Sequence, residues 1–285
     1  MGKNVFVWIV LALFYSNPAA AQVKKSVFVV TDAEGVAGIF RQEQVEPKNS
    51  ELRELLTGEV NAAVEGFWAG GAEEVTVWDG HAGSETLSLT TTHPRAKLLV
   101  GWMGLSMTLD RHYSAVAFIG QHSMANTRKG IMAHSYSSLG IQNMLLNGKP
   151  IGEIGMICTL AGYFGTAVIL LTGDQAAVDE MKSYVPQAET VAVKEGLGRY
   201  AGISLSASAS RQAIREAAER AMAKIGKVSP YKVEGVVTLQ IENTTRNSLS
   251  PDAGLAPGIV VLDDRTVRIQ GKDFLEAWTR WRVYR

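Results

Sequence analysis

Short apolar runs alternate with amphipathic stretches along the first two thirds of the chain. Four predominantly apolar runs lie at Val27–Val30, Val75–Trp78, Ala115–Ile119 and Ala167–Leu171. Such runs are typical of strands that a parallel sheet buries on both faces. Between the first two, apolar residues recur at helical spacing from Leu52 to Phe67, with Ser50 as the expected N-cap and Gly70-Gly71 at the end. This order predicts a right-handed βαβ unit whose two strands end at the same edge.

The rest of the chain predicts further helices and strands, and their pattern changes near residue 195. A turn at Asn147-Gly148 precedes an expected helix over Gly152–Phe164, a helix begins at Asp174, and Glu189–Val193 fits a strand. Beyond it we expect a helix and two strands, then a closing helix, over Ala209–Ile225, Val233–Ile241, Ile259–Ile269 and Lys272–Arg282. The pattern predicts an α/β fold with a mostly parallel sheet over 22–194 and a smaller α+β second domain over 195–285.

The first residues have the pattern of an export signal. Lys3 precedes the apolar run Val5–Phe14, and the small residues Ala19–Ala21 follow. This predicts a signal peptide over residues 1–21 and a mature protein that is exported, periplasmic or secreted. No later run reaches the roughly 18 apolar residues of a membrane span, so no membrane contact is expected after cleavage. Cys158 is the only cysteine, which excludes an internal disulfide.

Composition narrows the class of partner. Among 285 residues, 28 Lys and Arg balance 28 Asp and Glu, and the formal net charge is +0. The chain therefore lacks the excess of positive charge that would indicate nucleic acid or an anionic membrane as its partner. A small neutral or zwitterionic substrate agrees better with this balance.

Five side chains that can bind a metal follow strand ends or begin a helix: Asp32, Glu34, His81, His122 and Glu153. The carboxyl ends of parallel strands meet at one edge of a sheet, so we expect these residues to gather there. Imidazole and carboxylate suit zinc, and also cobalt or manganese. The Asp-x-Glu pair by itself equally fits a helix cap or a loop that binds its own amides.

The other polar candidates leave alternatives open. His134, in a loop of small residues, either takes part in catalysis or hydrogen-bonds a neighbouring loop. Asp79 either orients a ligand imidazole or ends its strand. His93 and His112 are expected at the surface, and Cys158 is expected to be a small buried hydrophobe.

Five motifs resemble the DppA-type zinc-dependent D-aminopeptidase family in the correct order over nearly the whole mature chain. The motifs are Val30-Thr31-Asp32-Ala33-Glu34-Gly35-Val36-Ala37-Gly38, Asp79-Gly80-His81, Ile119-Gly120-Gln121-His122, Met132-Ala133-His134-Ser135 and Pro150-Ile151-Gly152-Glu153-Ile154-Gly155. Two departures concern Trp78, which precedes Asp79, and Gly80, where the family pattern leads us to expect serine. The export signal is a third.

The resemblance implies a role for each site residue. Two zinc ions per subunit are implied, with Asp32 bridging them and His134 as the catalytic residue; the ligands are Asp32, Glu34, His81, His122 and Glu153. It also implies a three-layer α/β sandwich for the catalytic domain, a smaller second domain, and a homo-oligomer that forms a ring of ten subunits around a channel.

The expected reaction is hydrolysis of the first peptide bond of a short peptide, D-Ala-D-Ala for example, by a water that two metal ions activate. One alternative is a zinc-dependent peptide-binding protein of a transport system, although such binders usually have two comparable lobes. Another is a metal-dependent hydrolase of a different substrate, an amide or a phosphate ester.

Overall fold

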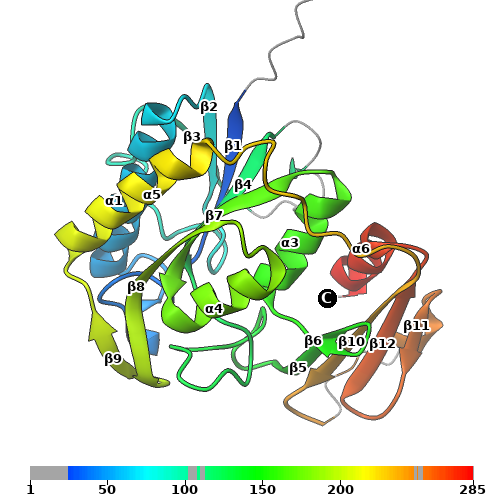
Figure 1. The fold of residues 1–285 in the computed structure, drawn as a ribbon. Coiled ribbons are helices and arrows are strands. Elements are labelled where there is room, and N and C mark those ends of the chain that lie inside the picture. The colour runs from blue at the N-terminus through cyan, green and yellow to red at the C-terminus, as the bar shows by residue number, and fades with distance from the viewer. Residues whose placement is uncertain (1–24, 102–107, 110–112, 247–248, 250–252, 285) are drawn as a thin grey trace, which may run out of the picture.

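The computed structural model describes residues 25–101, 108–109, 113–246, 249 and 253–284 (Figure 1). The expected export signal over 1–21 and His112 lie outside these ranges. The described chain forms two sheets, one of seven strands and one of five. None of its helices is long and apolar enough to cross a membrane.

The larger sheet is parallel except at one edge. Its strands follow the order β3-β2-β1-β4-β7-β8-β9. Their bounds are β1 (Ser26–Thr31), β2 (Glu74–Trp78), β3 (Ala96–Leu99), β4 (Ala115–Gln121), β7 (Ala167–Asp174), β8 (Glu189–Gly198) and β9 (Ala201–Ser204). Only β9 runs antiparallel to its neighbour. The sheet therefore carries most of its functional loops at a single edge.

Helices cover both faces of this sheet and complete the three layers (Figure 1). On one face, α1 (Ser50–Ala69) packs against α5 (Ala207–Met222), and on the other lie α3 (Glu153–Tyr163) and α4 (Gln175–Tyr184). Successive residues of β1 alternate between the two cores: Val27 and Val29 join α1 and α5, whereas Phe28 and Val30 join α3. Burial on both faces explains the continuous apolar run of β1.

The smaller sheet is antiparallel throughout, in the order β11-β12-β10-β5-β6. Its strands are β5 (Ile141–Leu146), β6 (Lys149–Pro150), β10 (Val237–Asn243), β11 (Ile259–Val261) and β12 (Thr266–Gly271). The last helix, α6 (Phe274–Tyr284), packs against β10, β12 and α3, and so joins this sheet to the larger layer. Two short 3-10 helices, η1 (Gln42–Gln44) and η2 (Ala253–Leu255), lie in connections.

The predicted α/β class is confirmed, while several element details differ. The side chain of Asn49, not Ser50, accepts the N–H of Leu52 at the start of α1. The expected strand Ile259–Ile269 is two antiparallel strands, β11 and β12, because the chain turns between them. Strands β3, β5, β6 and β9 were not predicted. The proposed division at residue 194 stays a prediction: β9 and α5 come after it yet pack with the larger sheet, and β5 and β6 precede it yet belong to the smaller one.

Candidate metal centre

Three strand ends and one helix start bring the five expected ligands together. Asp32 and Glu34 follow β1, His81 follows β2, and His122 follows β4. Glu153 is the first residue of α3, where a carboxylate suits the positive end of the helix. The side chains form two clusters: Asp32, Glu34 and His81 in one, and His122, His134 and Glu153 in the other.

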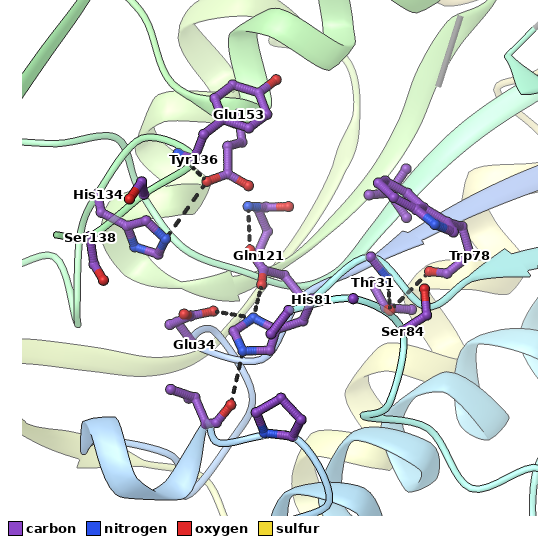
Figure 2. A pocket seen from close by; sticks show the side chains of 18 of the residues that line it. Thr31, Glu34, Trp78, His81, Ser84, Gln121, His134, Tyr136, Ser138 and Glu153 are labelled. Atoms are coloured by element: carbon purple, nitrogen blue, oxygen red, sulfur yellow. Dashed lines mark hydrogen bonds and ion pairs between the residues drawn. The ribbon is translucent and has the colours of Figure 1, made fainter. Parts of the chain in front are cut away.

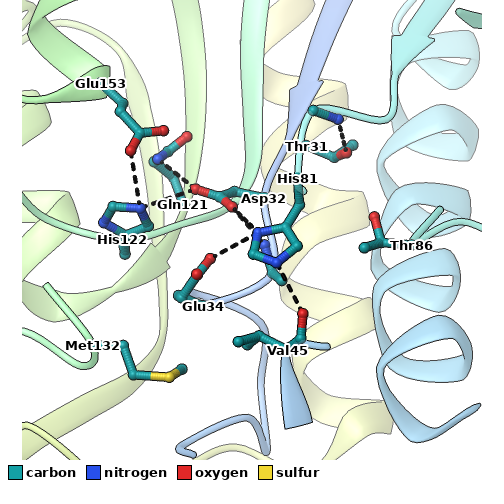
Figure 3. Close-up of polar contacts among 12 residues, drawn as sticks. Thr31, Asp32, Glu34, Val45, His81, Thr86, Gln121, His122, Met132 and Glu153 are labelled. Atoms are coloured by element: carbon teal, nitrogen blue, oxygen red, sulfur yellow. Dashed lines mark hydrogen bonds and ion pairs between the residues drawn. The ribbon is translucent and has the colours of Figure 1, made fainter. Parts of the chain in front are cut away.

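The Asp32 carboxylate lies between two imidazoles and connects the clusters (Figure 3). Its Oδ1 is 3.0 Å from Nδ1 of His81, and its Oδ2 is 3.2 Å from Nε2 of His122. The backbone N–H of Ala33 and the side-chain amide of Gln121 each donate to this carboxylate at 2.9 Å. Asp32 is 6% exposed, so these contacts hold a buried carboxylate in one orientation.

Each cluster has a second carboxylate on its outer side. Glu34 Oε2 lies 3.2 Å from Nδ1 of His81, and Glu153 Oε1 lies 3.4 Å from Nε2 of His122. The backbone N–H of Tyr136 donates to the same Glu153 oxygen at 2.7 Å. Each of these two imidazole nitrogens therefore faces two carboxylate oxygens.

Backbone carbonyls determine which ring nitrogen of each histidine carries the proton. His81 Nε2 lies 2.9 Å from the carbonyl of Val45, and His122 Nδ1 lies 2.9 Å from the carbonyl of Ser123. A carbonyl only accepts, so these nitrogens are donors. In the neutral rings the opposite nitrogens then direct their lone pairs at carboxylate oxygens. These electron-rich groups repel each other unless a cation lies between them.

The spacing and burial of these atoms fit a pair of divalent metal ions. Two ligand atoms bound at about 2.0–2.1 Å in a tetrahedral zinc site lie about 3.3 Å apart. The imidazole-to-carboxylate distances of 3.0, 3.2, 3.2 and 3.4 Å are close to that value. Moreover, His122 Nε2 and Glu34 Oε2 are buried without a hydrogen-bond partner. The donor set thus suits a metal centre in which Asp32 contributes one oxygen to each cluster.

Without metal, the same groups compensate each other's charge through protons. Burial alone would raise the pKa of Asp32, but the charge of the facing His122 and the hydrogen bond from His81 hold it well below its usual range. Burial likewise opposes ionisation of Glu153, yet His122 lowers its pKa to about 2. Conversely, the facing carboxylates raise the pKa of His81 and His122 well above normal against the effect of burial.

A cavity of about 590 Å³ opens on the centre (Figure 2). Its wall includes four of the expected ligands and His134; the four are Asp32, Glu34, His81 and Glu153. His122 is 1% exposed and lies behind the wall. The volume is in the usual range of small-molecule sites, roughly 300–1,000 Å³.

His134 combines contact with the centre and access to the cavity. Its Nδ1 lies 2.9 Å from the carbonyl of Met132, and its Nε2 is 3.8 Å from Glu153 Oε1. The ring stacks on His122 at 4.0 Å between centroids. The hydrogen bond stays within its own loop, the side chain lines the cavity, and a part in catalysis stays a prediction.

The loop that carries His134 has a strained backbone. Four non-glycine residues in it have positive φ: Asn126 (67°), Lys129 (61°), Met132 (48°) and Tyr136 (60°). Such conformations cost of order 1–3 kcal/mol each and persist where the surroundings impose them. Arg199 supplies part of that support, because its guanidinium donates to the carbonyl of Ala133 at 2.9 Å and its own carbonyl accepts from Met132 at 3.0 Å.

The remaining polar candidates lie apart from the metal centre. The Asp79 carboxylate accepts the N–H groups of Thr86 and Leu87, at 3.0 and 2.9 Å, so it fixes a loop and does not orient an imidazole. His93 is half-buried and accepts the N–H of Arg95. Burial raises the pKa of the Cys158 thiol, as expected for an inert core residue.

Lys194 is a supporting residue that sequence reasoning missed. This side chain is 3% exposed, and its ammonium donates to the backbone carbonyls of Glu34, Val36 and Ile39. Burial lowers its pKa to about 8, although nearby carboxylates oppose the shift. Lys194 therefore fixes the loop that presents Asp32 and Glu34. A lone lysine in β8 gives no local sign of this role.

Comparison with known proteins agrees with this geometry. Residues 26–283 match the peptidase M55 family, described as D-aminopeptidase. The chain belongs to the peptidase M55 family of D-aminopeptidases. It is 31% identical to a D-aminopeptidase of Bacillus subtilis (strain 168) over 258 residues, which cover 88% of this chain and 93% of the relative.

A solved structure has the same fold. It is described as a Zn-dependent D-aminopeptidase DppA from Bacillus subtilis, a self-compartmentalizing protease. The TM-score is 0.83 with 29% identity, over 91% of this chain and 96% of that one. The expected family resemblance is thereby confirmed for this M55 chain.

The charges of the centre predict opposite pH dependences for metal-free and metal-loaded protein. A raised histidine pKa stabilises the folded state below the unfolded value of about 6.5, and this contribution is lost as pH rises through the folded pKa. The lowered pKa values of Asp32 and Glu153 stabilise the folded state above about pH 4. This contribution is therefore constant in the pH range in which the histidines lose their protons. Metal-free protein should therefore lose stability above pH 6.5.

Metal-loaded protein should behave in the reverse way, because metal competes with protons for His81 and His122. Its apparent metal affinity should rise with pH, and metal binding should release protons. Thermal unfolding with chelator or with added zinc, at pH 6 to 9, measures both trends. Parallel curves for the two forms would contradict the metal assignment.

Replacement of Lys194 tests whether the ligand loop depends on its ammonium. Lys194→Met leaves three backbone carbonyls without their donor, and we expect a loss of about 2–4 kcal/mol in the free energy of unfolding. Metal content at limiting zinc should fall as well. Lys182→Met, at an exposed position of α4, is the matched control. Equal stability and metal content in the two variants would refute the role of Lys194.

Proposed function

We propose that this M55 protein is a binuclear zinc aminopeptidase that removes the first residue from short D-amino-acid peptides. The observation that carries the proposal is the Asp32 carboxylate, which has one oxygen toward His81 and the other toward His122. One zinc ion would be held by Asp32, Glu34 and His81, and the second by Asp32, His122 and Glu153. The zinc-dependence named for the Bacillus subtilis structure supports this reading.

Side chains and backbone groups around the centre orient the expected ligands and provide a proton carrier. Bound zinc ions supply a water of lowered pKa and polarise the substrate carbonyl. Gln121 and the N–H of Ala33 orient Asp32, and the N–H of Tyr136 orients Glu153. His134 reaches the cavity with Nε2, from which it can transfer a proton to the leaving amine.

His134 has a competing role as a third ligand of the second ion, because it belongs to the cluster with His122 and Glu153. Two distances favour a proton-transfer role. His134 Nε2 is 3.8 Å from Glu153 Oε1, whereas His122 Nε2 is 3.4 Å from the same oxygen. In addition, the His134 side chain is 14% exposed and that of His122 is 1% exposed. A proton carrier needs this access, and a ligand does not.

Assembly and location extend the same proposal. The relative named as self-compartmentalizing supports an oligomer of this chain, in which we expect ten subunits. The antiparallel edge of the larger sheet exposes the apolar Leu197 and Ile203, which suits a contact between copies.

We also propose export with cleavage after Ala21, so that the enzyme meets D-alanyl fragments of peptidoglycan outside the cytoplasm. Sedimentation as a monomer, or an uncleaved N-terminus in the exported protein, would reject these two extensions.

Two substitutions separate catalysis from metal binding. We expect His134→Ala to lower kcat for D-Ala-D-Ala by roughly 10²–10⁴-fold while two zinc ions per subunit remain. Asp32→Ala should lose both activity and metal, because it removes an oxygen from each cluster. Release of D-alanine and zinc content by elemental analysis measure the two effects, and His93→Ala is the matched control outside the centre.

The wild-type assay with zinc restored and then chelated, beside L-Ala-L-Ala, decides the reaction itself. Chelator-sensitive cleavage of the D substrate alone is the expected result. Full activity of His134→Ala would remove its catalytic role, and loss of one zinc in that variant would make it a ligand. Zinc-loaded protein that cleaves neither peptide would refute the aminopeptidase and favour a binding role.

A further inference from the structure

The wall of the cavity has an uneven distribution of charge. Its acidic residues are the carboxylates of the metal centre and the exposed Glu46. Among the described residues that line the cavity, Arg282 is the sole lysine or arginine. It comes from α6, whereas the expected ligands come from the loops of the larger sheet and from α3. A substrate in this cavity thus meets the expected metal ligands on several loops and on α3, and a guanidinium on α6.

The guanidinium of Arg282 lies over one ring of an aromatic cluster. Its Cζ lies 5.6 Å from the ring centroid of Trp281, which is 1% exposed. Trp278, four residues earlier in α6, lines the same cavity as Arg282, so one face of the helix forms this part of the wall. A cation–π contact with a buried ring limits the freedom of a long side chain, which reduces the entropy lost when it binds a ligand.

The same cluster connects Arg282 to the metal centre. Trp281 contacts the ring of Tyr136 edge to face, at 4.6 Å between centroids. The backbone N–H of Tyr136 in turn donates to Glu153 at 2.7 Å. The position of the guanidinium relative to the expected ligand Glu153 is therefore set by packed rings and one short hydrogen bond.

We infer that Arg282 binds the free C-terminal carboxylate of the substrate while the first peptide bond lies at the metal centre. A planar guanidinium can donate two parallel hydrogen bonds to a carboxylate, and an uncharged C-terminal amide offers a much weaker partner. The cavity then selects short peptides whose two ends are both free. This inference rests on the proposed aminopeptidase function and adds to it the substrate class.

The test compares D-Ala-D-Ala with its C-terminal amide, as kcat/KM, in zinc-loaded wild type, Arg282→Met and Arg282→Lys. Wild type should prefer the free acid by roughly 10- to 100-fold. In Arg282→Met this ratio should fall toward one, mainly through a higher KM for the acid. Arg282→Lys should be intermediate, because it keeps the charge and loses the bidentate geometry. Arg268→Met, on the exposed side of β12, should keep the wild-type ratio.

Each outcome has a definite meaning. A wild type that cleaves acid and amide equally would overturn the inference and leave the aminopeptidase intact. An unchanged ratio in Arg282→Met would overturn it too, and the Lys variant supplies the same readout if the Met variant folds poorly. Wild type that cleaves neither compound would instead refute the proposed function.

Discussion

The buried carboxylate of Asp32 between two imidazoles is the interaction on which the rest of the site depends. A carboxylate that is 6% exposed is costly to ionise unless cations or donors surround it. Here His81 and His122 face its two oxygens, and Gln121 and Ala33 donate the remaining hydrogen bonds. The outer carboxylates Glu34 and Glu153 then leave each imidazole with two acidic neighbours. Such an arrangement is stable only with protons or metal ions between the groups.

The surrounding loops are shaped to maintain this geometry. Gly35 approaches the backbone of β4 so closely that a Cβ would overlap the carbonyl of Gln121. The ammonium of Lys194 also donates hydrogen bonds to three backbone carbonyls of the same loop. The strained loop that carries His134 is held by Arg199, which lies in the turn between β8 and β9. Rigid scaffolding of this kind is what a preorganised site requires.

Much of this could be predicted from the sequence, for a physical reason. Strands buried on both faces are continuous apolar runs, so β1, β2, β4 and β7 were recognisable, and the ends of the first three located Asp32, Glu34, His81 and His122. β3 and β5 are only partly buried and carry weaker patterns. Lys194 escaped because its partners lie 155 to 160 residues away, and Gln121 because an amide beside a histidine has no distinctive spacing. Arg282 was not identified because its position at the cavity depends on how α6 packs against the rest of the fold.

Anomalous X-ray scattering at the zinc edge, from crystals grown with zinc, tests the central claim most directly. The account predicts two peaks in each subunit, one bound by Asp32, Glu34 and His81 and the other by Asp32, His122 and Glu153. Asp32 should contribute one oxygen to each ion. A single peak, or two peaks that Asp32 does not share, would contradict it.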